Sequence, residues 1–459
     1  MIVERSASIE TPHSSNATRN ACRLCAPLGA VWAYRGIANC VPLLHGGQGC
    51  ATYIRRYLIG HFREPVDVAA SNFSEQTAIH GGAERLATSL HNLAAQYNPS
   101  VIGVASTCLA ETIGEDLPFL VRRTLGRWKG DGPPPATITA STPSYAGDHA
   151  SGYRAAVRAI VEQLGGDRPG SDHRIGLFPP MVSPADLRSL AASVRAYHCE
   201  PITVPDPSEA FDGGAWADLE TLTAGGTEVR DIAAIGSACG LVGFTNPAPE
   251  PAPQDLLHER YNTPSVTLPL PVGLTACDQW HSALETFSGT SMPRAIEAER
   301  ARLLDAYRDG HKYVAGRRAA LYGETELILP LARLLWEIGM VPAICATGGD
   351  AKGLRRELDS LAPAGAEQIQ VLSESDFMDL DAGIDAYGVD MLIGHSRAYH
   401  LAQARHLPQV RIGFPVHDRM GAARIRMCDY AGTLELFERI ANACIERAQD
   451  GNSVGYLTM

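Results

Sequence analysis

The sequence predicts an α/β protein of three Rossmann-like domains, each built on a parallel, doubly wound sheet. Two observations lead to this fold class. Short apolar runs of strand length alternate with segments of helical length along most of the chain. At 459 residues the chain is also too long for one hydrophobic core, which predicts two to four domains.

The predicted strands follow one another at regular intervals. VIGVAS at 101–106 is apolar and partly β-branched, which suits a buried parallel strand. RIGLFPP at 174–180 is a similar run, and a helix should follow it with Ser183 as N-cap and Pro184 at its first position. Further strands are expected within 233–244, 318–324, 341–349, 369–374 and 390–395.

Composition breaks give approximate domain limits. LGGDRPGSDH at 164–173 is rich in Gly, Asp and Pro and indicates a linker, and a second break is expected at AGRR, 315–318. The proline-rich NPAPEPAPQD at 246–255 predicts a surface loop inside the middle domain. We therefore place the domains at 1–170, 171–315 and 316–459.

Charge and hydropathy exclude several function classes. A net charge of −12 and a pI near 5.7 disfavour nucleic acid as a partner, because phosphate binding needs clustered Lys and Arg. The chain contains no apolar run long enough to span a membrane, and its polar start, residues 1–20, lacks the apolar stretch of a signal peptide. Eleven cysteines without framework spacing argue against a secreted disulfide scaffold. We expect a cytoplasmic protein.

Cys25, Cys50 and Cys108 are the candidate metal ligands. Each lies among small residues that let the backbone approach a bulky inorganic group, and thiolate is the ligand that iron-sulfur clusters select. Their wide separation along the chain means that only tertiary folding could bring them together. Cys22 forms a C-x-x-C with Cys25, but without a second pair we interpret it as a neighbour, and the role of Cys40 is left open. The remaining cysteines are predicted to be core residues: Cys199, Cys239, Cys277, Cys345, Cys428 and Cys444.

Five segments resemble the beta chain of nitrogenase component 1 and its paralogues. They lie between residues 45 and 421, so the resemblance extends over most of the chain. The segments are HGGQGC at 45–50, YIRRYLIGHFREPVDVAASNFSEQTAIHGG at 53–82, STCLAETIGED at 106–116, STPSYAGDHASGY at 141–153 and RIGFPVHDRMG at 411–421. The resemblance implies the nitrogenase component 1 fold, which also has three α/β domains.

The resemblance further implies a cofactor and partners. In the family's catalytic members, the cysteines that match Cys25, Cys50 and Cys108 hold this subunit's half of an eight-iron P-cluster at the interface with an alpha-type chain. Ser144 matches a serine that can add an oxygen ligand when the cluster is oxidised. We therefore expect an 8Fe-7S cluster of the P-cluster type, or a 4Fe-4S cluster, in an α2β2 assembly. The implied electron donor is a separate ATP-dependent iron protein with its own 4Fe-4S cluster.

Four polar residues lie near these cysteines, and two of them, His45 and Glu111, have two interpretations. His45 either hydrogen-bonds a cluster sulfide or fills a structural role in its turn. Glu111, Glu115 and Asp116 follow Cys108 at a probable helix start, where capping is the default role, although Glu111 could instead orient a thiolate ligand.

The reaction is harder to predict, and three subtypes stay open. All three cysteines and Ser144 are retained, which favours an enzyme over the cofactor assembly scaffold, although TAGGTEVRDI at 223–232 resembles the scaffold branch. CRLCAPLGA at 22–30, together with YIRRYLIGHFREP, is most similar to nitrogenase-like reductases outside the dinitrogen-fixing set. His80 stands where dinitrogen-reducing beta chains usually carry phenylalanine at the iron-protein docking face. The leading hypothesis is a methylthio-alkane reductase, which cleaves carbon-sulfur bonds. The second is the beta-like chain of the cofactor assembly scaffold, and the third is the beta chain of an alternative-metal nitrogenase. No catalytic residue is predicted in this chain, because substrate reduction needs open metal positions at a second site.

Overall fold

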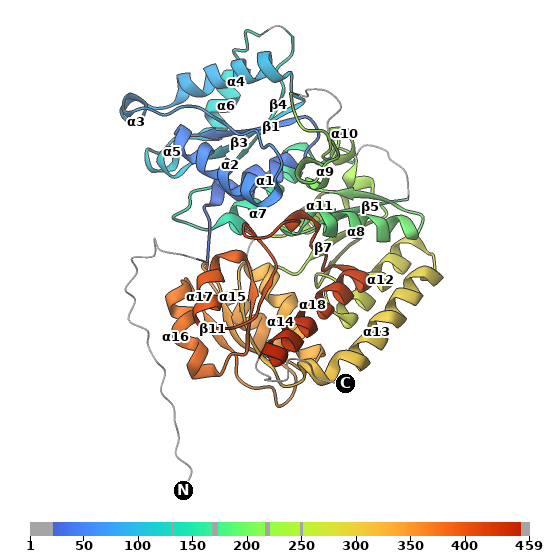
Figure 1. Cartoon of the computed structure of the whole chain (residues 1–459). Coiled ribbons are helices and arrows are strands. Elements are labelled where there is room, and N and C mark those ends of the chain that lie inside the picture. The colour runs from blue at the N-terminus through green and yellow to red at the C-terminus, as the bar shows by residue number, and fades with distance from the viewer. Residues whose placement is uncertain (1–21, 131, 168–172, 216–220, 248–250, 451–459) are drawn as a thin grey trace.

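The computed structural model describes residues 22–450 apart from 131, 168–172, 216–220 and 248–250. The polar first 20 residues and part of the predicted linker at 164–173 lie outside the described residues. Three parallel sheets form the framework, one in each third of the chain. Figure 1 shows the N-terminal third at the top, with the middle and C-terminal thirds packed together below it.

The N-terminal sheet carries the candidate ligands. Its strand order is β2-β1-β3-β4, and all pairs are parallel. The strands are β1 (Cys40–His45), β2 (Ala69–Ala70), β3 (Val101–Ser106) and β4 (Ala136–Ala140). The helices are α1 (Ala26–Arg35), α2 (Gln48–Phe62), α3 (Glu75–His80), α4 (Ala83–Tyr97), α5 (Cys108–Thr112), α6 (Leu117–Leu125) and α7 (His149–Leu164).

The middle sheet has the order β6-β5-β7-β8 and is also parallel. Its strands are β5 (Arg174–Phe178), β6 (Glu200–Thr203), β7 (Gly240–Phe244) and β8 (Ser265–Leu268). The helical segments are α8 (Pro184–Ala196), α9 (Ser208–Phe211), α10 (Val229–Ile232), η1 (Ile235–Ser237), α11 (Pro253–Tyr261), α12 (Leu274–Ser288) and α13 (Arg294–Val314).

The C-terminal sheet has five parallel strands in the order β11-β10-β9-β12-β13. These are β9 (Arg318–Tyr322), β10 (Val341–Ala346), β11 (Gln370–Leu372), β12 (Met391–Gly394) and β13 (Gln409–Arg411). Its helical segments are α14 (Thr325–Glu337), α15 (Lys352–Leu361), α16 (Phe377–Tyr387), η2 (Ser396–Ala398), α17 (Tyr399–Ala404), η3 (Ala422–Arg424) and α18 (Asp429–Asp450).

The predicted fold class is confirmed, and each strand run identified in the sequence contains an observed strand. The predicted helix start at α8 is also present, since the Ser183 side chain accepts a hydrogen bond from the Asp186 amide at 3.0 Å. The predicted C-terminal limit of the loop at 246–255 is wrong, because a helix begins inside this range. Pro253 begins α11, because proline lacks only an amide hydrogen that the first helical turn leaves unpaired.

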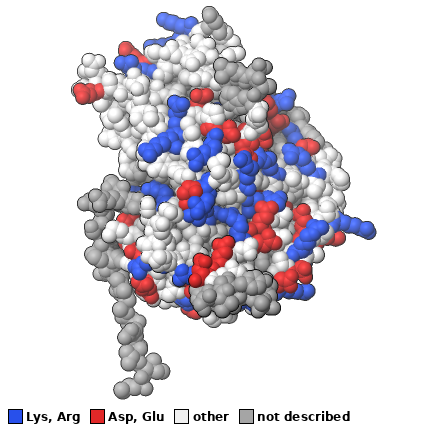
Figure 2. Space-filling model, viewed as in Figure 1, with Lys and Arg blue, Asp and Glu red and all other residues white. Residues whose placement is uncertain are grey.

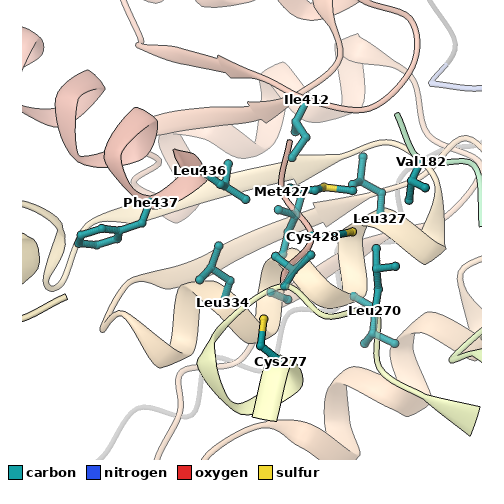
Figure 3. Close-up of a cluster of buried hydrophobic side chains, with 14 of the residues drawn as sticks. Val182, Leu270, Cys277, Leu327, Leu334, Ile412, Met427, Cys428, Leu436 and Phe437 are labelled. Atoms are coloured by element: carbon teal, nitrogen blue, oxygen red, sulfur yellow. The ribbon is translucent and has the colours of Figure 1, made fainter. Parts of the chain in front are cut away.

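A single hydrophobic core joins the middle and C-terminal sheets. Figure 3 shows side chains from both thirds gathered in this core, among them Leu270, Cys277 and Leu334. The helix α18 packs along α13, so the end of the chain returns to cover the middle third. These two sheets are therefore held together by shared apolar burial.

Basic and acidic side chains are interleaved on the face shown in Figure 2. Arg188 and Arg424 both pair with Asp212, and Arg426 pairs with Glu435. These guanidinium groups therefore form ion pairs with carboxylates of the same chain. No helix in the described part of the chain is long and apolar enough to cross a membrane.

Two buried histidines give the fold a predictable acid sensitivity. Burial lowers the pKa of His61 and of His395 to about 3, compared with about 6.5 in an unfolded chain. Below pH 6.5 the unfolded chain binds protons that the folded chain does not, so each histidine lowers the free energy of unfolding by about 1.4 kcal/mol per pH unit. The melting temperature should fall steadily as the pH is lowered from 7 to 5.5, as measured by circular dichroism.

The variant His395→Gln should flatten this pH dependence, because it removes one of the two groups. His149 has a raised pKa and therefore acts in the opposite sense, but only above pH 6.5, since below that value it is protonated in both states. An unchanged slope in His395→Gln would contradict the assignment.

Candidate metal centre

The three candidate cysteines all lie at helix N-termini. Cys25 is the N-cap residue of α1, Cys50 is in the first turn of α2, and Cys108 is the first residue of α5. The helices α2 and α5 follow directly after β1 and β3, so Cys50 and Cys108 lie beyond the carboxyl ends of neighbouring strands. Ligand sites in open α/β sheets form at that edge, and a helix N-terminus favours a thiolate.

Tertiary folding brings the three thiols close enough to affect one another's ionisation. Burial, together with negative charge on Cys50 and Cys108, raises the pKa of the Cys25 thiol to about 11. Burial and the neighbouring Cys108 likewise raise the pKa of Cys50. The three cysteines therefore form one cluster, which we call the thiol cluster, and binding of a metal by these thiols would release their protons.

The thiol cluster opens onto the surface of the chain. Cys50 is exposed, and Cys25 and Cys108 are half-buried. Two large apolar side chains nearby are exposed: Leu109, which follows Cys108 in the sequence, is 41% exposed, and Tyr145, which follows Ser144, is 68% exposed. An open set of thiols with exposed apolar neighbours is suited to a group shared with a second protein.

A single metal ion does not fit the thiol cluster. Within the described residues, no three His, Cys, Asp or Glu side chains converge as ligands of one ion. Three thiols that interact electrostatically without closing on one point suit a larger, multi-iron group, which also requires ligands from elsewhere. The residues present therefore fit an iron-sulfur cluster better than a zinc site.

Ser144 connects the loops of two candidate ligands. Its backbone amide donates a hydrogen bond to the Cys108 sulfur at 3.2 Å, and its hydroxyl accepts one from the Ala26 amide at 3.1 Å. The hydroxyl therefore supports the first turn of α1, next to Cys25.

Glu111 positions the loop that carries Ser144. Its carboxylate accepts hydrogen bonds from the hydroxyls of Ser106 and Ser141, while the Ser106 hydroxyl accepts one from the Thr142 amide at 2.8 Å. These contacts fix residues 141–144 against the end of β3. Of the two interpretations of Glu111, the structure supports the one in which it orients the ligand region, and it does so through the loop.

His45 has the structural role. It is fully buried, and its ring is hydrogen-bonded to the Ser71 hydroxyl at 3.0 Å on one side and to the Glu115 carboxylate on the other. Glu115 also accepts a hydrogen bond from the Gly82 amide, so it links two turns. Asp116 caps α6 by accepting from the Phe119 amide at 2.9 Å, as predicted.

One supporting residue was not found from the sequence. His149, the first residue of α7, is 1% exposed and accepts a hydrogen bond from the Leu24 amide at 3.2 Å. Its other ring nitrogen pairs with Glu324 at 2.5 Å, in the C-terminal third. Burial opposes protonation of His149, but the Glu324 charge outweighs it and raises its pKa. This hydrogen-bonded pair holds the segment that leads into Cys25.

The family model described as nitrogenase component 1 type oxidoreductase matches residues 25–445. The chain belongs to this family. The nitrogenase molybdenum-iron protein beta chain of Clostridium pasteurianum is 33% identical over 434 residues, which cover 94% of each chain. The vanadium-iron protein beta chain of Trichormus variabilis is 29% identical and covers 91% of this chain and 92% of its own.

Solved structures agree with the family assignment. The chain superimposes on a structure titled "Nitrogenase Cp1 at pH 6.5" with a TM-score of 0.92 and 31% identity, covering 100% of this chain and 98% of the other. The expected nitrogenase component 1 fold is confirmed, and this chain is a beta-type oxidoreductase subunit of the family. The narrower assignment to methylthio-alkane reductases stays a prediction, because the relatives above are named as nitrogenase beta chains.

The remaining cysteines and His80 lie outside the thiol cluster. Cys22 is 3% exposed and packs in the core of the C-terminal sheet, and Cys40 is buried within β1. The six remaining cysteines are free thiols, five of them buried and Cys239 half-buried. His80 is the last residue of α3, and its neighbour Ile79 is 76% exposed.

Proposed function

We propose that this chain is the beta-type subunit of a nitrogenase-like reductase, and that Cys25, Cys50 and Cys108 hold its share of an iron-sulfur cluster at the interface with an alpha-type partner. The observation that carries the proposal is the meeting of three thiols from three helix N-termini on an open face. Such a cluster would supply low-potential one-electron transfer between proteins.

The surrounding residues would adjust the properties of the bound group. The Ser144 amide donates to the Cys108 sulfur at 3.2 Å, and hydrogen bonds to cluster sulfurs alter the reduction potential. Glu111 and the pair His149 and Glu324 fix the two loops that present Cys108 and Cys25. The proposed role of this chain is therefore to hold and orient the iron-sulfur cluster.

The proposed assembly is an α2β2 heterotetramer that accepts electrons from an ATP-dependent iron protein. Closed twofold symmetry is the usual outcome for such complexes, and the exposed apolar residues beside the thiol cluster supply surface for the alpha-type chain. The exposed Ile79 and the adjacent His80, at the end of α3, are proposed to lie where the iron protein docks.

The proposed substrate is a small thioether. The N-terminal motifs resemble reductases outside the dinitrogen-fixing set, while the full cysteine set favours turnover over scaffolding. Dinitrogen reduction is the second candidate, because the relatives include molybdenum-iron, vanadium-iron and iron-iron nitrogenase beta chains. Reductive cleavage would deliver two electrons and two protons to the carbon-sulfur bond, giving a thiol and a hydrocarbon.

Turnover of the assembled enzyme tests this proposal. The complex, supplied with its iron protein, ATP and a reductant, should release methanethiol and ethane from ethyl methyl sulfide. Gas chromatography would quantify both products, and omission of ATP is the control. Rapid ammonia formation from dinitrogen without thiol release would instead identify a nitrogenase. Transfer of a cofactor to an apo-nitrogenase without turnover would identify a scaffold.

A further inference from the structure

A cavity lies where the three thirds of the chain meet, away from the thiol cluster. It has a volume of about 200 Å³ and is bounded by α7, by the segments that follow β5, β7 and β8, and by the first turns of α11 and α14. Figure 3 shows Val182, Leu270, Leu327 and Met427, four of its lining residues, at one edge of the core. The carboxyl ends of parallel strands and the junctions between domains are preferred places for ligand sites.

The walls of the cavity are mostly apolar. Phe178 and Phe244, at the ends of β5 and β7, contribute aromatic surface beside the aliphatic and methionine side chains named above. A dry cavity of about 150 Å³ with such walls can hold a molecule of the size of benzene. The cavity is therefore large enough for a small organic molecule.

One polar group in the wall lacks a partner. Gln254 is 1% exposed, and its amide nitrogen donates a hydrogen bond to the Thr267 hydroxyl at 2.8 Å. Its amide oxygen has no hydrogen-bond partner within the described part of the chain. An acceptor left unpaired in a buried setting is unfavourable, so it provides a reason for a hydrogen-bond donor to bind there.

The carboxylates of the wall already have partners within the chain. Glu324 pairs with His149, and Glu326 pairs with Arg154. The Tyr153 hydroxyl donates to the Pro179 carbonyl at 3.0 Å. A charged ligand would have to compete with these buried ion pairs, which disfavours it against a neutral one.

We propose that this cavity binds a small uncharged molecule with an apolar body and one hydroxyl group, which donates its proton to the amide oxygen of Gln254. The apolar body would fill the space between Phe178, Leu270 and Met427. Glu324 belongs both to the cavity wall and to the ion pair that holds the segment before Cys25, so an occupant would contact a support of the thiol cluster.

Binding of pentan-1-ol to the assembled complex tests this site. Butyl methyl ether is similar in size but has no proton to donate, so it serves as the comparison ligand. Pentan-1-ol should bind about tenfold more tightly than the ether by ligand-observed NMR titration, the difference expected for one buried hydrogen bond. In Gln254→Leu this preference should disappear, while binding of the ether should be retained.

Two further variants test whether binding depends on the cavity itself or on the stability of the whole protein. Val157→Phe, which adds bulk to the α7 wall of the cavity, should abolish binding of both compounds without loss of the folded state by circular dichroism. Gln403→Leu, on the exposed side of α17, is the matched control and should bind like the unmodified protein. The proposal is overturned if pentan-1-ol shows no saturable binding, or if its preference over the ether persists in Gln254→Leu. Either result would leave the proposed reaction untouched, because thioether turnover is measured separately.

Discussion

Replacing Cys50 or Cys108 with alanine should strip cluster iron from the purified complex and remove its electron paramagnetic resonance signal. Each change deletes one of three thiols that the fold brings together, and no other thiol of the chain is placed to substitute for it. The loss should exceed the roughly 10- to 100-fold weakening that follows removal of a residue supporting a metal ligand. Iron per αβ pair is the direct measurement.

Cys444→Ala is the matched control for this experiment. Cys444 is a free, buried thiol on α18, in the core that joins the middle and C-terminal thirds. Its replacement removes a sulfur and a little apolar packing, so it should lower the melting temperature slightly and leave the iron content unchanged. Equal iron in Cys50→Ala, Cys108→Ala and the unmodified complex would refute the thiol cluster as the binding site.

The sequence predicted the ligand candidates because their signal is local. Cys108 follows an apolar run that forms β3 as expected, and Cys50 lies in a glycine-rich turn. The pairing of His149 with Glu324 gave no such signal, since 175 positions separate the two residues in the sequence. Long-range polar contacts of this kind depend on how the domains pack. The periodicity of apolar residues in the sequence does not predict that packing.

Some strands were missed for a related reason. CVPLLH became the central strand β1, although a proline normally argues against such a position. Pro42 is tolerated because β2 pairs only with Leu43 and Leu44, so that side of the ladder ends before the proline. The strand is set by its tertiary neighbours rather than by its own residues.

The motif around Ser144 predicted the position of this residue but not which of its atoms contacts the thiol cluster. Its resemblance to a serine ligand placed it beside the cluster, and the structure does bring it into contact with Cys108. Its hydroxyl, however, accepts a hydrogen bond from Ala26, while its backbone amide contacts the sulfur. A motif can indicate the neighbourhood of a residue, but which of its atoms faces the ligand depends on the loop conformation.

The variant Gly152→Ala should both destabilise the chain and reduce its iron content. A Cβ atom at this position of α7 would lie 1.9 Å from the Ala26 carbonyl oxygen of α1, and backbone cannot move aside as a flexible side chain can. Overpacking of this kind costs about 1–3 kcal/mol, which is more than the roughly 1 kcal/mol that alanine gains over glycine in a helix. The melting temperature should therefore fall.

The iron content should fall as well, because α1 can relieve the clash only by shifting away from α7, and Cys25 is its N-cap residue. Gly214→Ala is the matched control, since a Cβ there meets nothing within 4 Å and its backbone does not require glycine. That variant should keep both its melting temperature and its iron. The contrary result is lower stability with unchanged iron content in Gly152→Ala. That result would contradict the claim that the close contact between α1 and α7 positions Cys25 as a ligand.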